Sequence, residues 1–511
     1  MTTIEAADAL FLTGDLEKAT GAYRRLIATD HRDHAAWRGL GAARLRARAF
    51  GEANDALDRA VRLRPDDAEA WSLMAEALFK LGDVEPAIEA YRRATADARL
   101  RSAAEENVAI MIPGSTSAGN TGILAARRAF GRSLHAGIKP VDRPPRPPSA
   151  GKLRIGYVSA FFDSANWMKP VYGVINRHDR ERFEVHLVSL GGDPSEQAGY
   201  RDYDLDVIWQ VGSLDDERIA GLLAAAGIDV LVDLNSYSAP RWLRVFPRRP
   251  APVQIGWFNS FATYGFDCFD GIVGDDVVIP IEEEGYFTER VLRVPGTYLA
   301  FEVLYAVPDV APPPCCRNAG MLTFGALTSS YKLNDATLGV WARVLRSAPG
   351  SRMLIRTSTL AEPSNRTHLL ARFAALGIAP ERLDLEGGAA HFEFLQSYDR
   401  IDVALDMFPY SGGTTTSEAL WQGVPVLTCA GDRWVARTSE SLLRAAGLDA
   451  WVAADRDDLV VKASALARDP GTPAALAALR TGMRARLATS AACDTAGLCR
   501  ALEQIYRQAV G

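Results

Sequence analysis

The chain has 511 residues, of which 48% are hydrophobic and 23% charged, and its formal net charge at pH 7 is −6. A single hydrophobic core does not grow to this size, so we expect roughly two to four domains. The acidic balance excludes a strongly basic protein whose whole surface attracts nucleic acid, so no nucleic-acid partner is expected.

The sequence carries no sign of export or of a membrane span. Its first residues are acidic and lack the basic region of a secretory signal. No apolar run reaches the length of about 18 residues that a transmembrane helix needs. The six cysteines form no CxxC pair and no zinc-type spacing with histidine, so neither a metal site nor a disulfide framework is expected. We therefore expect a cytoplasmic protein without a metal.

Residues 1–110 repeat with a period of 34. Small or large side chains recur at this spacing in four sets: Ala19, Ala53 and Ala87; Ala7, Gly41 and Ala75; Tyr23, Leu57 and Tyr91; and Trp37 with Trp71. Gly14 and Gly82 also match, but Arg48 interrupts that series. This is the tetratricopeptide pattern, in which each repeat is a pair of packed helices. We expect about three repeats with a concave surface for a protein partner; a capping or dimerising scaffold is the alternative.

A break follows the repeats. Residues 112–121 are loop-like, residues 122–135 are helical in pattern, and five prolines between 140 and 148 predict an extended linker. From Lys152 onward short apolar runs alternate with helical stretches. The expected strands are Leu153–Ser159, Phe183–Leu190, Val207–Val211, Asp229–Leu234, Val253–Phe258, Gly271–Gly274, Leu322–Leu327, Arg352–Arg356, Leu383–Glu386, Val403–Leu405, Val426–Cys429 and Trp451–Ala453.

Strands that alternate with helices predict parallel sheets covered on both faces. A second proline cluster, Pro308–Pro314, divides the strands into two sets, so we expect two Rossmann-like α/β lobes with an active site in the cleft between them. The predicted segments are repeats over 1–110, a helix and linker over 111–151, an N-terminal lobe over 152–307, a nucleotide-binding C-terminal lobe over 308–472, and helices packed on the body over 473–511.

The strongest local motif is DMFPYSGGTTTSEALWQGVPVLT, Asp406–Thr428. Gly412 and Gly413 allow close backbone approach, and Thr414–Thr416 begin a helix whose N-terminus favours phosphate. Glu418 lies one turn further on, within reach of a ribose hydroxyl. The alternative interpretation of Thr415 and Glu418 is a capping box, which can coexist with phosphate binding.

Two weaker motifs add positive charge. The segment FGALTSSYKLND places Lys332 just past a strand end, where a lysine neutralises a diphosphate leaving group, although a lone lysine is more often solvated. The segment AGDRWVARTSESLL places Arg437 near another helix start, which is a weak indication of anion binding.

Three features occur together in a known family: the repeats, LRIGYVSAFF with RHDRERFEVHLVSL, and LRVFPRRPAPVQIGWFNSFATYG with ALDMFPYSGGTTTSEALWQGVPVLT. Over about residues 1–470 the chain resembles the bacterial O-linked N-acetylglucosamine transferase and SPINDLY family. The resemblance implies a GT-B fold and inverting transfer of a sugar from a nucleotide donor to Ser or Thr hydroxyls of proteins. It also implies that the C-terminal lobe holds the nucleotide and that no metal or other cofactor is needed.

The resemblance also assigns roles to residues. Lys332 matches the family lysine that contacts the diphosphate, and Tyr331 lies beside it. Thr414 and Thr415 match the threonines of the phosphate-binding helix, and Glu418 falls where an acidic residue holds the ribose. In the N-terminal lobe, the residues that match a cleft-lining loop are Gln254, Trp257 and the turn Asn259–Gly265.

The chain departs from the family around the sugar and base pockets. The usual residues are replaced by Phe161, Ala165, Tyr237, Thr328, Phe394 and, relative to animal members, Gly413. The loss of these residues around the sugar and base pockets indicates a different donor. Some bacterial relatives with repeats transfer nonulosonic acids from a CMP donor to flagellin. UDP-N-acetylglucosamine and a CMP-linked nonulosonate are therefore both retained. The single phosphate of the second would weaken the role of Lys332 as a diphosphate clamp.

Family members commonly have a histidine where this chain has Ala165, and its replacement leaves His391 and Asp163 as candidate bases. The polar surroundings of His178 predict a helix end or turn. We expect leaving-group stabilisation by Lys332 and the helix start to carry most of the rate. The sequence thus favours a hexosyl- or nonulosonyl-transferring enzyme, with a protein acceptor bound through the repeats and flagellin as a candidate. The alternative is a catalytically degenerate adaptor that binds protein only.

Overall fold

The computed structural model describes residues 3–144, 151–164, 166–201 and 203–511. Its internal contacts divide the chain into two compact units, each built from three segments. Unit 1 comprises Met1–Ser117, Pro313–Tyr410 and Arg456–Leu476; unit 2 comprises Ala118–Pro312, Ser411–Asp455 and Ala477–Gly511. Within the described ranges, no helix has the length and apolar character that crossing a bilayer requires.

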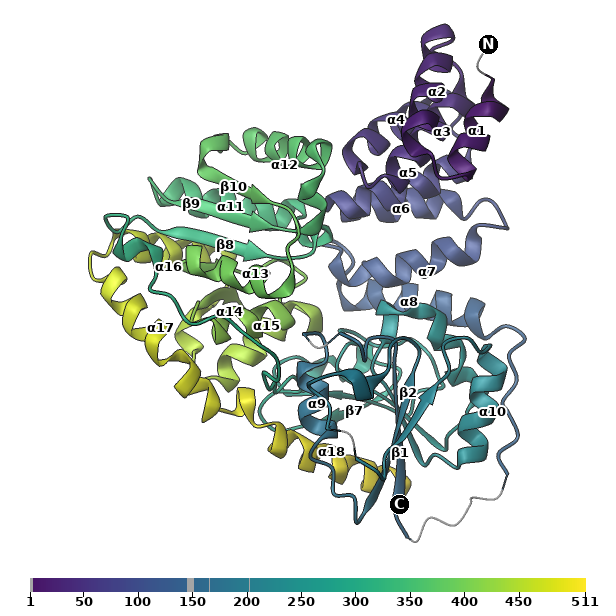
Figure 1. The fold of residues 1–511 in the computed structure, drawn as a ribbon, viewed down its shortest axis with the longest axis vertical. Coiled ribbons are helices and arrows are strands. Elements are labelled where there is room, and N and C mark those ends of the chain that lie inside the picture. Colours follow the sequence, from purple (N-terminus) through teal and green to yellow (C-terminus); the bar gives the residue numbers. More distant parts are fainter. Residues whose placement is uncertain (1–2, 145–150, 165, 202) are drawn as a thin grey trace. The chain divides into compact units, whose positions relative to one another are not determined.

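The repeats form three helix pairs, which confirms the prediction (Figure 1): α1 (Ile4–Leu12), α2 (Leu16–Thr29), α3 (His34–Arg46), α4 (Phe50–Leu63), α5 (Ala68–Leu81) and α6 (Val84–Ala94), followed by α7 (Arg101–Met111). The period-34 alanines are fully buried, and a Cβ on Gly41 would meet the Leu57 side chain at 2.4 Å. Small residues therefore lie where helices approach, and large ones fill the space between them.

The turn between the two helices of each repeat uses a left-handed residue. Its φ is +85° at Gly14, +63° at Arg48 and +91° at Gly82. Glycine adopts this conformation without cost, whereas a side chain in it is strained. Arg48 therefore differs from Gly14 and Gly82 in its side chain but adopts the same left-handed backbone conformation.

The second and third repeats pack on the C-terminal lobe within unit 1. Helix α12 (Pro363–Ala375) contacts α4, and buried Asn365 accepts the Gly51 N–H at 3.0 Å and donates to the Arg48 carbonyl at 2.9 Å. Gly82 approaches the turn Ser330–Lys332 so closely that a Cβ there would lie 2.6 Å from the Leu333 carbonyl oxygen. The repeats therefore contact the segment that carries Lys332.

The C-terminal lobe of unit 1 contains four parallel strands in the order β10-β9-β8-β11. They are β8 (Thr323–Leu327), β9 (Arg352–Arg356), β10 (Leu383–Glu386) and β11 (Val403–Leu405). Their accompanying helices are α11 (Asp335–Ser347), α12, α13 (His391–Gln396) and α16 (Arg456–Arg468). The apolar runs predicted as strands are the buried strands of this sheet.

Unit 2 contains a seven-stranded parallel sheet in the order β3-β2-β1-β4-β5-β6-β7. Its strands are β1 (Leu153–Ser159), β2 (Phe183–Ser189), β3 (Val207–Gln210), β4 (Val230–Asp233), β5 (Val253–Gly256), β6 (Gly271–Gly274) and β7 (Arg290–Arg293). The order reverses between β1 and β4, the crevice where doubly wound sheets bind ligands. Strand β7 was not predicted, because two of its four residues are arginines and only one is buried.

Further elements complete unit 2: α8 (Gly119–His135), α9 (Lys169–Ile175), α10 (Asp216–Ala226), α14 (Thr414–Trp421), α15 (Trp434–Ala445), α18 (Thr495–Val510) and the paired strands β12 (Val426–Cys429) and β13 (Val452–Ala453). Helix α17 (Thr472–Ala488) contributes residues to both units. Helix α18 packs on α9.

Two predictions about the segment after the repeats need correction or fall outside the structure. Residues 112–121 are not one loop, because a short helix covers Ile112–Gly114 and α8 already begins at Gly119. Pro113 at the start of that short helix supplies the φ that a helix needs. Most of the predicted proline linker, residues 145–150, lies outside the described residues.

Candidate functional site

In unit 1, Lys332 ends the short turn after β8 and is half-buried. Its Nζ lies 4.3 Å from the centroid of the Tyr410 ring, a cation–π distance. Tyr331 packs edge-on against Tyr410, with ring centroids 5.5 Å apart, and stacks on Phe79 of α5 at 5.1 Å. Lys332 is therefore placed by aromatic rings rather than extended into solvent, as a lone surface lysine would be.

The pKa of Lys332 reflects this setting. Burial lowers it to about 8, and the Asp406 carboxylate opposes that change. A lysine near this value is still largely charged at neutral pH, but its ammonium group has lost part of its hydration. Such a cation is suited to binding an anion, because the ammonium group is already partly dehydrated and binding a phosphate removes little further water from it.

In unit 2, α14 begins at Thr414 with Gly413 as its N-cap. Gly413, Thr414 and Thr415 are partly exposed, whereas the next turn, from Thr416 onward, is buried. The first N–H groups of a helix have no partner within it, so this start offers donors to an anion. A Cβ on Gly412 would lie 2.4 Å from the Thr416 hydroxyl, so the position requires glycine.

Hydroxyl groups hold the preceding loop in place. Thr416 Oγ1 lies 2.8 Å from Ser439 Oγ, which donates to the Gly412 carbonyl at 2.9 Å. Ser411 Oγ donates to the Val435 carbonyl at 2.8 Å. The starts of α14 and α15 are thus connected through one buried hydroxyl network, which explains why this sequence holds more hydroxyl groups than a helix cap needs.

Glu418 does not form the capping box that the sequence permits. Helix α14 starts one residue before Thr415, so Thr415 is inside the helix, and Glu418 is buried. Its Oε1 lies 3.0 Å from Nζ of Lys169 in α9, and both side chains are at most 3% exposed. Burial lowers the pKa of Lys169, while the Glu418 carboxylate opposes that change. The carboxylate that was predicted to hold a ribose therefore has a buried cationic partner.

Other predicted binding residues also have partners in unit 2. Arg437 forms an ion pair with Glu283, with Nη1 and Oε2 2.9 Å apart, and donates to the Gly431 carbonyl at 2.8 Å. Gln254 is fully buried and donates to the carbonyls of Phe246 and Cys268. These contacts support the fold locally.

The turn Asn259–Gly265 closes over the carboxyl ends of β4 and β5. Trp257, just before it, is fully buried and donates to the Tyr298 carbonyl at 3.1 Å. Tyr264 donates to the buried carboxylate of Asp233 at 2.8 Å. Burial raises the pKa of Asp233, and hydrogen bonds to the carboxylate oppose this. Asp233 was not singled out from the sequence; its position at the end of a buried strand was the available signal.

The candidate bases lie in different units. His391 begins α13 in unit 1, is half-buried and stacks on Phe394. Asp163 is exposed in unit 2, where a Cβ on Gly192 would lie 2.5 Å from its Cβ. Ala165, the replacement for the family histidine, lies outside the described residues.

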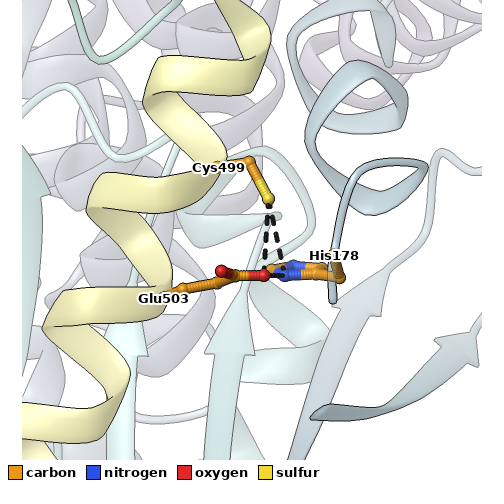
Figure 2. Close-up of side chains that lie close together, drawn as sticks. All are labelled: His178, Cys499 and Glu503. Atoms are coloured by element: carbon orange, nitrogen blue, oxygen red, sulfur yellow. Dashed lines mark hydrogen bonds and ion pairs between the residues drawn. The ribbon is translucent and has the colours of Figure 1, made fainter. Parts of the chain in front are cut away.

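His178 is buried, although its surroundings in sequence are polar. Figure 2 shows that it faces Cys499 and Glu503 of α18. Nδ1 lies 2.9 Å from Glu503 Oε1, and Nε2 lies 2.7 Å from the Tyr157 hydroxyl. Ligands of one zinc ion stand about 3.3 Å apart, from the usual bond lengths and tetrahedral angles. The shorter Nδ1–Oε1 distance and the Asp179 N–H donated to the same oxygen identify a hydrogen-bonded network.

Comparisons with known proteins match both parts of the chain. The model of glycosyl transferase family 41 matches residues 139–308 and 318–502, and a tetratricopeptide-repeat model matches residues 44–105. A solved structure of a Thermobaculum terrenum O-GlcNAc transferase mutant superposes with a TM-score of 0.80 at 30% identity, covering 99% of this chain and 97% of that one. The two parallel-sheet lobes therefore form a GT-B fold preceded by repeats.

Curated relatives are longer. A protein of Petunia hybrida described as a probable UDP-N-acetylglucosamine–peptide N-acetylglucosaminyltransferase SPINDLY is 29% identical over 70% of this chain. Its counterpart in Arabidopsis thaliana is 30% identical over 70%, and the UDP-N-acetylglucosamine–peptide N-acetylglucosaminyltransferase of Caenorhabditis elegans is 22% identical over 70%. The matches span only 38%, 39% and 40% of those proteins.

Proposed function

Because this chain belongs to glycosyl transferase family 41, we propose that it is a protein O-glycosyltransferase that moves a sugar from a nucleotide donor to Ser or Thr side chains. The observation that carries the proposal is the start of α14, where Gly413, Thr414 and Thr415 are partly exposed above a buried hydroxyl network. A helix start of this kind binds phosphate, and a nucleotide sugar presents phosphate to the enzyme.

The reaction is inversion at the anomeric carbon. The acceptor hydroxyl attacks that carbon from the side opposite the phosphate, the bond between the carbon and the phosphate oxygen breaks, and the hydroxyl proton passes to a base. Lys332 and the α14 start stabilise the charge that develops on the phosphate. Within unit 1, the Nζ of Lys332 lies 4.3 Å from the centroid of the Tyr410 ring, and this contact supports a fixed position of the ammonium group in that role.

The general base is the less specific part of this mechanism. His391 and Asp163 remain the candidates: His391 is half-buried beside Phe394, and Asp163 is exposed. No metal is required in the proposed reaction, because Lys332 and the helix dipole supply the positive charge that a divalent cation provides elsewhere.

Two donors fit different observations. The names of the relatives support UDP-N-acetylglucosamine. The pairing of Glu418 with Lys169, together with the replacements Phe161 and Phe394, supports a changed donor such as a CMP-linked nonulosonate. Thermal shifts with UDP, GDP and CMP separate these cases: a response to UDP alone assigns the first donor, and a response to CMP alone the second. A response to none favours a repeat adaptor without transferase activity.

The acceptor is a protein that binds along the repeats, and flagellin is the candidate acceptor. Deletion of the gene in a flagellated host is expected to lower the mass of flagellin by the transferred sugar. An unchanged flagellin mass rejects this acceptor and leaves the transferase proposal to be tested on other proteins.

The Lys332→Ala variant tests the leaving-group role. We expect transfer to a protein acceptor to fall by about 100-fold or more, as for the loss of one charge-stabilising group elsewhere. Lys18→Ala, which removes an exposed repeat lysine, is the matched control and should transfer normally. Full transfer by Lys332→Ala would reject the assignment.

A further inference from the structure

A pocket of about 580 Å³ lies in unit 1 where the repeats meet the C-terminal lobe. The repeats contribute Arg46 from α3, Arg48 from the turn between α3 and α4, and Lys80 from α5 to its wall. The other wall consists of the segments that follow β8 and β9, including Ser329 and Ser358. The proposed reaction uses none of these five side chains.

The pocket carries an excess of positive charge. Its lining contains three cations and one carboxylate, Glu76. Among the residues that the structure describes, neither arginine nor the lysine forms an ion pair with a carboxylate. Arg46 and Lys80 occupy the last turns of α3 and α5, where a cation complements the helix dipole. The dipole explains a basic residue at each end, but not their convergence with Arg48 on one pocket.

Arg48 is the residue that the fold does not require. Its φ of +63° is the left-handed conformation that glycine supplies at the equivalent turns, Gly14 and Gly82. The turn is held from outside, because Asn365 donates to the Arg48 carbonyl at 2.9 Å. A side chain kept in a strained backbone conformation indicates a function for that side chain.

The walls also present hydrogen-bond donors. Nη2 of Arg48 lies 3.4 Å from Oγ of Ser358, and Thr357 and Thr359 flank that serine in the lining. Guanidinium and ammonium groups only donate, hydroxyl groups can donate, and an ionised carboxylate only accepts. The pocket is therefore complementary to carboxylates, which arginine binds through two parallel hydrogen bonds.

We propose that this pocket binds an acidic segment of the acceptor protein. The inference rests on the proposed function only in calling that protein an acceptor. Stacked repeats bind polypeptide along their surface, and the carboxyl ends of parallel strands are where such sheets bind ligands. A polypeptide that follows the repeats to the sheet edge passes Arg48, so Glu or Asp side chains of that segment enter the pocket.

The test uses the full-length protein and a fluorescein-labelled peptide in which one Ser is flanked by Glu residues, measured by fluorescence anisotropy. We expect binding that weakens as salt rises, and an affinity loss of about tenfold when Arg48→Gly is combined with Arg46→Gln. Arg48→Gly is expected to fold, because the other two repeats have glycine at this turn. The matched control is Arg59→Gln, an exposed residue of α4 outside the pocket lining.

Three outcomes would overturn the inference: no binding of the Glu-flanked peptide, equal binding of a Lys-flanked peptide, or an unchanged affinity in the double variant. Displacement of the labelled peptide by UDP or CMP, with nucleotide binding also lost in the double variant, would assign the pocket to the donor and reject an acceptor role. Peptide binding without any thermal response to nucleotides would sink the proposed transferase function and leave the acidic-segment site standing.

Discussion

At the scale of single residues, the surroundings of a side chain decide what it can do. Lys332 follows a strand end, and its sequence context alone favours a solvated lysine. The Tyr410 ring and the packing around the turn lower its pKa to about 8. That change makes the lysine sensitive to pH in a range where an ordinary lysine stays charged.

The pKa of Lys332 gives a prediction about donor binding. In the proposed reaction the charged form binds phosphate, and because burial has lowered the pKa, that form is lost as the pH rises through about 8. We expect nucleotide affinity to fall about tenfold between about pH 7 and about pH 9. In Lys332→Arg the guanidinium stays charged, so its affinity should hardly change with pH. Parallel pH profiles for the two proteins, measured by calorimetry, would contradict this role.

Lys169 and Glu418 show what sequence analysis cannot reach. They are 249 positions apart, and no sequence pattern around either residue predicts that the two form an ion pair. The motif around Glu418 predicted a ribose contact, and the structure adds a buried ammonium group at 3.0 Å. An ion pair removed from water is costly to break, because the remaining partner keeps an uncompensated charge. The pair therefore fixes α14 against α9.

At the scale of elements, the turns of the repeats determine how unit 1 is assembled. Gly14, Arg48 and Gly82 share one backbone conformation but have different surroundings. A Cβ at Gly14 would meet only the Arg46 side chain, at 3.9 Å. At Gly82 it would meet the backbone of Leu333 and Ser330. The third repeat turn thus packs directly on the segment that carries Lys332.

Gly82→Ala and Gly14→Ala separate strain from contact. Both place a side chain in the left-handed region, at a cost of about 1–2 kcal/mol. Only Gly82→Ala also forces the Lys332 turn to move, so we expect it to lose more stability, by about 1–3 kcal/mol, and to weaken nucleotide binding. Thermal unfolding and nucleotide titration of both variants provide the comparison; equal effects would mean that the repeat does not position the lysine turn.

The elements also show where local patterns are insufficient. The buried strands were predicted almost to the residue because their apolar runs are continuous. Strand β7 was missed because only Leu292 among its residues is buried. The capping box was wrong for a different reason: a nearby lysine competes for the Glu418 carboxylate, and a local pattern does not contain that competitor.

At the scale of the whole molecule, residues far apart in sequence close each unit. His178 and Glu503 are 325 positions apart, and their hydrogen bond connects the middle of α18 to the turn after α9. The ionised Glu503 carboxylate can only accept, so in a neutral ring Nδ1 carries the proton and donates it, and Nε2 is left to accept from the Tyr157 hydroxyl. Burial lowers the pKa of His178, and Glu503 opposes this, so the ring is neutral in the native state.

This network predicts how stability depends on pH. The folded pKa of His178 lies below its unfolded value, so as the pH falls below about 6.5 the unfolded state gains a proton that the native state resists. We expect stability to decrease by up to about 1.4 kcal/mol per pH unit from this group. His178→Gln keeps a donor and an acceptor but does not titrate, and should lose less stability. Hydrogen exchange of α18 amides between about pH 7.5 and about pH 5.5 measures the difference; identical losses would exclude His178 as the cause.

The sequence by itself determined the repeats, the two sets of parallel strands and the glycine-threonine helix start at Gly413–Thr414, because each follows from a local period or from adjacent residues. Only the tertiary structure decided which charges meet. Pairing across hundreds of residues depends on how packed elements bring side chains together, and no local period encodes it. The tertiary structure therefore pairs Glu418 with Lys169 and buries His178 against α18. It also places Arg48, which interrupts a glycine series in the sequence, in the wall of a basic pocket.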